Sequence, residues 1–129
     1  MNISICSRTA AKMLLQKEFP KNTSVICFYD PDGTYLDYSG YAAEVIYIPL
    51  DDFKTDLPQV DMIVDFIRRA ESRKQNIICQ CEKGQNRSAG CAAAIMEYYH
   101  NNGQSVFDDN RYRPDEMVYY AVLNALDRE

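Results

Sequence analysis

The sequence predicts an α/β fold with a mostly parallel central sheet of about four or five strands, flanked by helices. Short β-rich apolar runs alternate along the chain with segments whose apolar residues recur at helical spacing, and such alternation builds parallel sheets. The chain has 129 residues, of which 47% are hydrophobic, which is enough for one core and too little for two. We therefore expect residues 1–129 to form a single domain.

The first half of the chain contains three predicted strands and one predicted helix. Ser7 is a typical N-cap residue, and residues 8–18 after it carry apolar side chains on one helical face. The Asp-Pro-Asp-Gly stretch at residues 30–33 is a turn signature that ends the second strand. The predicted strands are residues 3–5, 24–29 and 44–48, and the inward-facing helix residues are Ala11, Leu14, Leu15 and Phe19.

The second half is predicted to contain a helix, a buried strand and two further helices. Gly103 is expected to stop the third helix and Pro114 to open the last one, with an irregular stretch between them. The predicted elements are a helix at residues 58–72, a strand at 77–80 and a helix at 87–101. The longest irregular segment, residues 30–43, is rich in Tyr, Asp and Gly and is expected to rim a pocket.

Residues 76–88 combine a strand, a tight loop and a helix start, a pattern typical of an anion site. Backbone N–H groups of such a loop converge on an anion, and the helix dipole favours its negative charge. Gly84 permits the sharp turn, and Arg87 offers a planar fork for two phosphate oxygens. The same field favours the thiolate form of Cys81, which is the reactive form of cysteine.

This segment resembles the signature His-Cys-x5-Arg-Ser/Thr of the cysteine-dependent protein tyrosine and dual-specificity phosphatases. The resemblance covers about residues 25–126, is closest to the compact microbial members, and implies a phosphotyrosine-phosphatase-like fold. It implies that Cys81 is the nucleophile, Arg87 the phosphate clamp and Ser88 the hydroxyl that assists departure of the thiolate. The family's histidine is replaced here by Gln80. The residues expected to bind phosphate are Glu82, Lys83, Gly84, Gln85, Asn86 and Arg87.

The resemblance also implies a general acid about thirty residues before the nucleophile, because the leaving oxygen must be protonated. Asp52 fits the family pattern Ile-Pro-x-x-Asp, and a single gap in the alignment would move the role to Asp51. Asp56 is a more distant candidate. The alternative is that all three carboxylates cap the following helix or solvate a loop.

The net charge of −5 and pI near 4.9 argue against nucleic acid or an anionic membrane surface as the main partner, since both attract basic faces. The sequence contains neither a long apolar run nor a recognisable signal peptide, so a cytoplasmic protein is expected. No cofactor and no metal are expected.

Five cysteines, an odd number without Cys-x2-Cys pairs, disfavour a disulfide framework and a structural zinc site. Cys6, Cys27 and Cys91 are expected to be small core residues. Cys79 shares a strand face with Cys81 and is interpreted as a core residue, with a redox partner of Cys81 as the alternative.

Several other conspicuous residues receive ordinary structural interpretations. His100, the only histidine, is expected at the surface near a helix end. The charge of Lys83 is offset by Glu82, so phosphoinositides are not expected substrates. Four helical tyrosines are expected to pack rather than to stack on substrate: Tyr98, Tyr99, Tyr119 and Tyr120.

The sequence therefore predicts metal-independent hydrolysis of phosphate monoesters through a phosphocysteine at Cys81. The expected substrates are phosphotyrosine in proteins, with phosphoserine and phosphothreonine as further candidates, and small phosphomonoesters. Phosphate or vanadate is the expected ligand of the loop. One alternative is a catalytically weak or inactive module that binds phosphorylated partners. Another is a thiol-based reductase, such as an arsenate reductase, although in those relatives the loop lies near the N-terminus.

Overall fold

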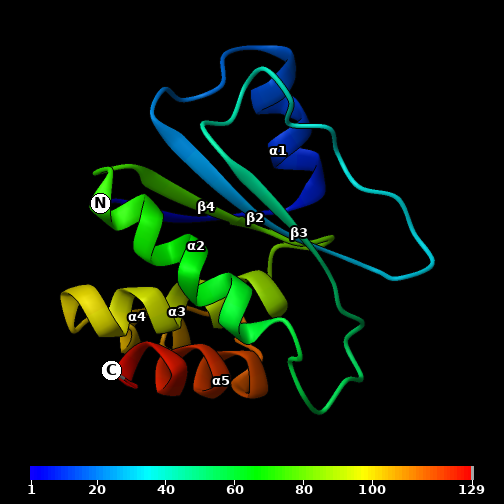
Figure 1. The fold of residues 1–129 in the computed structure, drawn as a ribbon. Helices are drawn as coiled ribbons and strands as arrows, with labels where there is room; N and C mark the ends of the chain where they lie inside the picture. Colours follow the sequence, from blue (N-terminus) through cyan, green and yellow to red (C-terminus); the bar gives the residue numbers. More distant parts are fainter. Residues whose placement is uncertain (129) are drawn as a thin grey trace.

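The computed structural model of the chain, which describes residues 1–128, contains a four-stranded, entirely parallel sheet in the order β1-β4-β2-β3 (Figure 1). The predicted fold class is confirmed, with four strands. Val25 stands between Val45 and Ile78 in the register, at the centre of the sheet. The strands are β1 (Ile3–Cys6), β2 (Thr23–Tyr29), β3 (Val45–Pro49) and β4 (Asn76–Gln80).

Helix α1 lies on one face of the sheet and the other helices lie on the opposite face (Figure 1). Ser7 caps α1 as predicted, because its hydroxyl accepts a hydrogen bond from the N–H of Ala10. The helices are α1 (Arg8–Gln16), α2 (Val60–Ser72), α3 (Arg87–His100), α4 (Gln104–Phe107) and α5 (Glu116–Asp127).

Three predicted helix boundaries are wrong by a few residues. Helix α2 begins two residues late, because the N–H of Val60 closes a turn on the carbonyl of Leu57. Pro114 does not open α5; instead, the side chain of Asp115 caps it by accepting a hydrogen bond from the N–H of Val118. Helix α1 ends before residue 18, and the stretch after Gly103, expected to be irregular, contains the single turn α4.

Alternate residues of β2 face two separate cores. Val25 and Cys27 face α1, whereas Ile26 and Phe28 face α2, α3 and α5. Helix α3 lies in the middle of the larger layer and is buried from Arg87 to Ile95. Its small side chains permit this burial: a Cβ on Gly90 would lie 2.5 Å from the carbonyl oxygen of Asp115. The Ala-rich run thus brings α3 and α5 close together.

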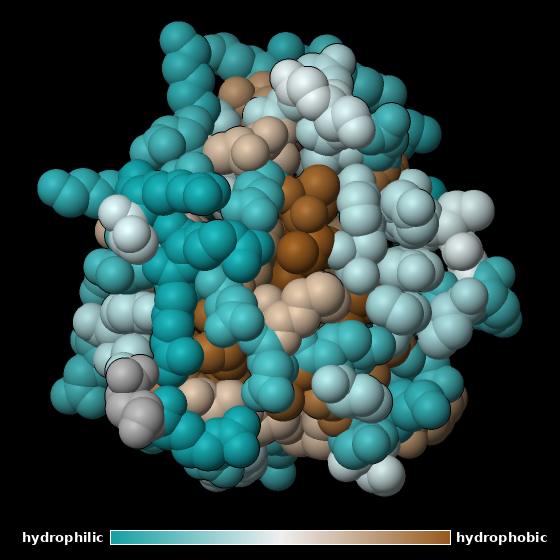
Figure 2. Space-filling model, in the orientation of Figure 1, coloured by the Kyte–Doolittle hydropathy of each residue, from teal (hydrophilic) through white to brown (hydrophobic). Residues whose placement is uncertain are grey.

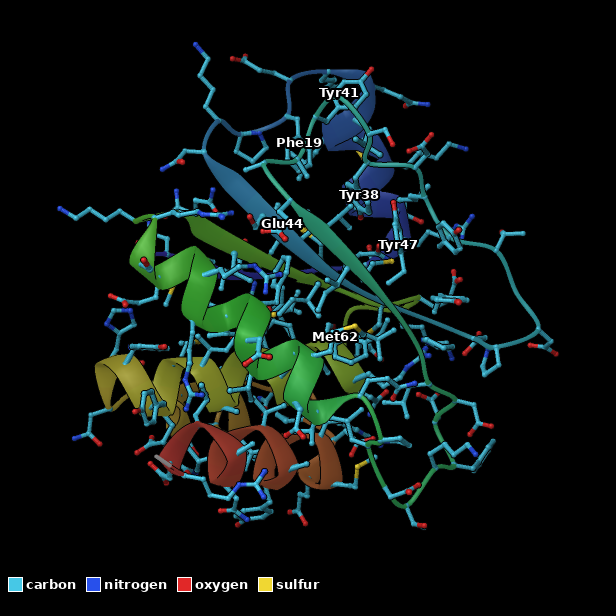
Figure 3. The ribbon with its side chains drawn as sticks, viewed as in Figure 1. Phe19, Tyr38, Tyr41, Glu44, Tyr47 and Met62 are labelled. Carbon is cyan, nitrogen blue, oxygen red and sulfur yellow. The ribbon has the colours of Figure 1, made fainter. Side chains whose placement is uncertain are left out.

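The 30–43 segment has no helix or strand but is fixed to the α1 face of the sheet by aromatic side chains. Phe19, Tyr38, Tyr41 and Tyr47 lie together there (Figure 3), and the Phe19 and Tyr38 ring centroids are 6.0 Å apart. Tyr38 is 1% exposed. Burial of this ring, together with the neighbouring aromatic contacts, holds the segment against the sheet.

The surface residues His100, Tyr98 and Tyr120 can be compared with the structural roles expected from the sequence. His100 ends α3 on the surface, as predicted, with Nε2 3.0 Å from the Met1 carbonyl oxygen. Tyr98 and Tyr120 are exposed at the surface, yet their rings pack edge-on against Tyr99 and Tyr119, with centroids 4.8 Å and 5.0 Å apart, as predicted. Figure 2 shows a strip of apolar residues on the face of the molecule turned toward the viewer. The strip lies where the edge strand β3 runs in Figure 1. Within residues 1–128, no helix is long and apolar enough to cross a membrane.

The core analysis predicts different costs for two truncations in α2. Ile67 is fully buried, so Ile67→Ala should lower the free energy of unfolding by about 2–5 kcal/mol. Met62 lies on the exposed side of the same helix (Figure 3), and Met62→Ala should change the free energy by less than about 0.5 kcal/mol. Urea denaturation of both variants measures the difference, and equal costs would contradict the assignment of the buried face.

Candidate active site

The predicted anion loop, residues 81–86, connects the carboxyl end of β4 to the N-terminus of α3. Cys81 follows the last strand residue and is 2% exposed, and Arg87 is the first residue of α3 and is 3% exposed. Asn86 occupies the N-cap position but makes no side-chain capping hydrogen bond. The first N–H groups of α3 are therefore not closed off by a capping side chain, which suits an anion.

The link between β1 and α1 holds the loop from one side. Gly84 has a φ of +64°, and a Cβ at this position would lie 2.5 Å from the backbone nitrogen of Ser7. Next to this contact, the N–H of Cys81 donates to the carbonyl of Cys6, and the N–H of Arg8 donates to the carbonyl of Glu82. Glycine is thus required at residue 84 both by the left-handed backbone and by the close approach.

The segment before α5 holds the loop from the other side. The N–H of Arg113 donates to the carbonyl of Gln85 at 2.9 Å, and the N–H of Asp115 donates to the carbonyl of Asn86 at the same distance. The amide nitrogen of the Asn86 side chain donates to the carbonyl of Arg113 at 2.8 Å. These three hydrogen bonds fix the loop before any ligand arrives, so its amides need little reorganisation to meet an anion.

The sulfur of Cys81 lies beside the hydroxyl of Ser88. The two atoms lie 3.0 Å apart, and Ser88 is fully buried. A hydroxyl in this position can donate a hydrogen bond to a thiolate, which stabilises sulfur when it carries negative charge. The structure therefore brings together the two residues that the resemblance pairs chemically.

Arg87 contacts both neighbouring strand-end loops. Its Nη1 donates to the carbonyl of Leu50 and, at 3.0 Å, to a carboxylate oxygen of Asp30. Its Nε lies 3.0 Å from Asp52 Oδ1 in an ion pair. The Nε–H bond, however, points at no acceptor among the described residues. A buried guanidinium thus keeps one unsatisfied N–H at the wall of the site, and such a donor favours an incoming anion.

A cavity of about 90 Å³ lies in front of the loop. It brings together two of the predicted catalytic residues, Cys81 and Arg87, with the favoured general acid. Gly84, Gln85 and Ser88 support the loop without lining this cavity. The residues that line it are Asp30, Asp52, Cys81, Glu82, Lys83, Asn86 and Arg87.

The three candidate acids occupy different positions. Asp52 lines the cavity that also contains Cys81 and Arg87. Asp51 instead accepts a 2.7 Å hydrogen bond from the N–H of Phe53 and so stabilises a turn in its own loop. Asp56 lines neither this cavity nor the neighbouring ones. None of the three caps α2, whose N-cap residue is Gln59 without a side-chain hydrogen bond. The geometry thus places Asp52, rather than Asp51, in one cavity with Cys81.

Gln80, in the position of the family's histidine, holds the start of the loop. Its Oε1 accepts from the hydroxyl of Tyr38 at 2.7 Å and from the thiol of Cys27 at 3.0 Å, and its Nε2 donates to the carbonyl of Cys81. Burial raises the pKa of Cys27 to about 12 and also raises the pKa of Tyr38, so both remain protonated donors at neutral pH. All polar atoms of this buried amide are therefore used.

Two residues of the site were missed from the sequence. Asp30 was interpreted only as a turn residue, and Tyr38 only as part of an irregular segment. The signal for Asp30 was its position directly after β2, because the neighbouring parallel strand β4 ends at the same edge of the sheet. No local signal marked Tyr38, whose partner Gln80 is 42 residues away.

The other cysteines do not extend the site. All five cysteines are free, and Cys27, Cys79 and Cys91 are buried core residues as predicted, whereas Cys6 is partly exposed. A hydrogen bond with Cys91, together with burial, raises the pKa of Cys79 well above its ordinary value. A thiol held in this way favours the core interpretation over a redox partner. Among residues 1–128 there is no group of three His, Cys, Asp or Glu side chains that could hold a metal.

Comparison with known proteins agrees with this arrangement. A family model described as the Rit1 DUSP-like domain matches residues 51–118, just over half of the chain. No curated protein sequence is significantly similar to the chain.

Several solved structures share the fold at low sequence identity. Tk-PTP in its active form has a TM-score of 0.64 at 15% identity, covering 98% of this chain and 91% of its own. Human DUSP28 has a TM-score of 0.61 at 13% identity, covering 97% and 91%. PTPMT1 in complex with PI(5)P has a TM-score of 0.61 at 11% identity, covering 95% and 88%. The chain therefore has the fold of the cysteine-based tyrosine and dual-specificity phosphatases.

The close contact at Gly84 yields a matched pair of variants. Gly84→Ala should remove phosphate binding and lower stability by more than about 2 kcal/mol, because a methyl group there meets the backbone of Ser7. Gly40 also has a positive φ, +81°, but a Cβ there meets nothing within 4 Å. Gly40→Ala should cost only about 1–2 kcal/mol and leave phosphate binding intact. Calorimetric titration with phosphate and urea denaturation distinguish the two, and identical behaviour would refute the contact.

The hydrogen bonds of Gln80 predict a graded pair of effects. Gln80→Leu leaves the Tyr38 hydroxyl, the Cys27 thiol and the Cys81 carbonyl without this partner, so it should destabilise the protein by about 1–3 kcal/mol. Tyr38→Phe removes one donor but leaves Cys27 on the same oxygen, so it should cost about 1 kcal/mol. Denaturant unfolding measures both, and a neutral Gln80→Leu would show that the network does not hold the loop.

Proposed function

Since the chain belongs to the Rit1 DUSP-like domain family, we propose that it hydrolyses phosphate monoesters through a phosphocysteine at Cys81. One observation carries the proposal. A buried guanidinium, with an N–H that has no acceptor within residues 1–128, lies at the wall of the cavity that also holds a cysteine and a carboxylate. This arrangement supplies an anion clamp, a nucleophile and an acid within one small space.

In the first displacement, the loop amides and Arg87 hold the three non-bridging phosphate oxygens. The thiolate of Cys81 attacks phosphorus, a P–S bond forms and the ester P–O bond breaks. The substrate phosphate takes the place of the Asp52 carboxylate at Arg87, which releases Asp52 from its ion pair. Asp52 takes up a proton from solvent as it leaves the ion pair, and the carboxyl then donates this proton to the leaving oxygen.

In the second displacement, water attacks the phosphocysteine. The Asp52 carboxylate, now without its proton, accepts one from the attacking water. The P–S bond breaks, and sulfur leaves as a thiolate that Ser88 stabilises by donating its hydroxyl proton in a hydrogen bond over the 3.0 Å gap. Phosphate then leaves, Asp52 returns its proton to solvent and pairs with Arg87 again, and the enzyme is back in its starting state without a redox change.

The proposed substrates are protein phosphotyrosine, with phosphoserine and phosphothreonine as further candidates, and small aryl phosphates. Inorganic phosphate and vanadate are the proposed ligands of the empty enzyme, because their oxygens match the donors of the loop. Among the structural relatives, PTPMT1 carries PI(5)P and a mouse putative dual specificity phosphatase carries zinc tungstate. Both ligands contain tetrahedral oxyanions or their analogues, which is the shared chemistry that supports an oxyanion site.

A phosphate-binding module without turnover is the second candidate. The contacts of Asp30 and Asp52 with Arg87 favour it, because both carboxylates compete with phosphate for the guanidinium. One solved structure of the same fold is a human tyrosine phosphatase-like serine/threonine/tyrosine-interacting protein, with a TM-score of 0.61 at 11% identity. Such a module would bind vanadate and phosphopeptides but release no phosphate.

Hydrolysis of p-nitrophenyl phosphate separates the candidates. The wild type should turn over this substrate, and Cys81→Ser should be inactive while still binding phosphate, because serine keeps the shape but not the reactive thiolate. Absence of turnover by the wild type, combined with phosphate binding, would establish the binding module instead.

The two adjacent aspartates provide a matched test of the acid. Asp52→Asn should lower kcat by about 10²–10⁴-fold, because the leaving oxygen loses its proton donor. Asp51→Asn retains an oxygen that can accept from the Phe53 N–H, so its effect should be less than about fivefold. The reverse order of effects would move the role to Asp51.

A further inference from the structure

We propose that the site selects phosphotyrosine flanked by basic residues, so that its natural substrate class is a phosphorylated protein segment rich in Arg or Lys. This inference rests on the proposed hydrolase function and extends it to the residues on either side of the phosphate. Its basis is the distribution of charge in two larger cavities that adjoin the catalytic one.

Asp30 lines all three cavities and so marks their junction. On one side of it, toward β2 and α1, a cavity of about 400 Å³ includes Tyr29, Tyr35 and Glu82 in its walls. On the other side, a cavity of about 410 Å³ lies between the loops that follow β2 and β3. This second cavity is lined by Asp30, Pro31, Asp32, Asp51, Asp52 and Phe53. A bound phosphate therefore has space for chain on both sides.

The charges around these cavities are mostly negative. Five carboxylates line the three cavities, against three cations, Arg8, Lys83 and Arg87. Arg8 donates twice to the neutral Thr34, so it keeps its charge and offsets part of the negative charge of the cavity toward β2 and α1. Arg87 is the cation that the phosphate itself takes. Once the phosphate dianion is bound, the five carboxylates have only Arg8 and Lys83 as compensating cations, and cationic groups on the substrate supply the rest.

The five carboxylates around the cavities, Asp30, Asp32, Asp51, Asp52 and Glu82, form an acidic rim. The unsatisfied N–H of Arg87 favours an anion in the middle of this rim. Arg87 is 3% exposed, and its Nε–H has no acceptor among the described residues although Asp52 is 3.0 Å away. The ligand that fits is therefore anionic at its centre and cationic at its edges. A phosphotyrosine between arginines or lysines has this pattern, and the tyrosine rings of the first cavity offer faces for a guanidinium.

The same rim opposes other phosphorylated molecules. A phosphoinositide headgroup and a nucleic acid terminus both carry further phosphates beside the reacting one, and these would face Asp32 and Glu82. Phe53 is 92% exposed beside the acidic cavity, and it can contact the aliphatic stem of a lysine or arginine side chain. Charge and surface chemistry thus favour a basic peptide.

The test uses three phosphotyrosine peptides of equal length whose flanking residues are Arg, Ala or Glu. The wild type should show a kcat/KM about tenfold higher for the Arg peptide than for the Glu peptide, and added salt should reduce the ratio, because exposed charges are screened. p-Nitrophenyl phosphate, which has no flanks, reports whether the enzyme works at all. If it is not hydrolysed, the proposed function fails; if it is hydrolysed without any peptide preference, only this inference fails.

Two charge-reversal variants sharpen the test. Asp32→Lys should lower the preference for the Arg peptide by about threefold or more. It should leave p-nitrophenyl phosphate hydrolysis unchanged, because Asp32 is exposed and lines only the second cavity, between the loops that follow β2 and β3. Glu71→Lys makes the same charge change at an exposed position of α2 that lines none of these three cavities. It should leave the ratio of kcat/KM for the Arg and Glu peptides unchanged. Equal effects of both variants would indicate net charge rather than the rim.

Substrate comparisons with the wild type test the proposal without any variant. Faster hydrolysis of the Glu peptide would overturn it. So would a higher kcat/KM for a 5′-phosphorylated oligonucleotide, or for phosphatidylcholine vesicles containing PI(5)P, than for the Arg peptide.

Discussion

Burial of the Arg87 guanidinium is the constraint around which the site is organised. A guanidinium keeps its positive charge in a protein. A nearly inaccessible guanidinium must therefore be surrounded by carbonyl and carboxylate oxygens that accept its hydrogen bonds. Those partners come from the loops after β2 and β3, namely Asp30, the carbonyl of Leu50 and Asp52. The need to satisfy one cation thus draws three strand ends into a single cavity and brings a carboxylate next to the cysteine.

The loop that carries this cation is held by the rest of the fold rather than by its own residues. The β1–α1 link contacts it at Gly84, the segment before α5 bonds to two of its carbonyls, and Gln80 fixes its first peptide. Each brace comes from a different part of the chain, so the loop geometry depends on the completed sheet. A preorganised ring of amides can stabilise charge on phosphate oxygens without rearranging during the reaction.

The replacement of histidine by Gln80 changes how the loop is held. An imidazole has two nitrogens, whereas the glutamine amide accepts twice on Oε1 and still donates from Nε2. Here both acceptor positions are filled by neutral donors, Tyr38 and Cys27, whose raised pKa values keep their protons in place. The loop start is therefore held by a neutral network, and the charge near Cys81 comes from Arg87 and the helix rather than from a neighbouring imidazole.

The local pattern of the chain determined the elements and the centre of the site. Alternating apolar runs and helical periodicity predicted the parallel sheet, and the Cys81-to-Ser88 spacing predicted a cysteine, an arginine and a hydroxyl around one anion, because strand, loop and helix are contiguous there. Only the tertiary structure placed Asp52, and not Asp51, in one cavity with Cys81, added Asp30 to that cavity, and paired Gln80 with Tyr38. Those choices depend on which strand ends lie side by side and on which way each loop turns, and such long-range contacts leave no periodic trace in the sequence.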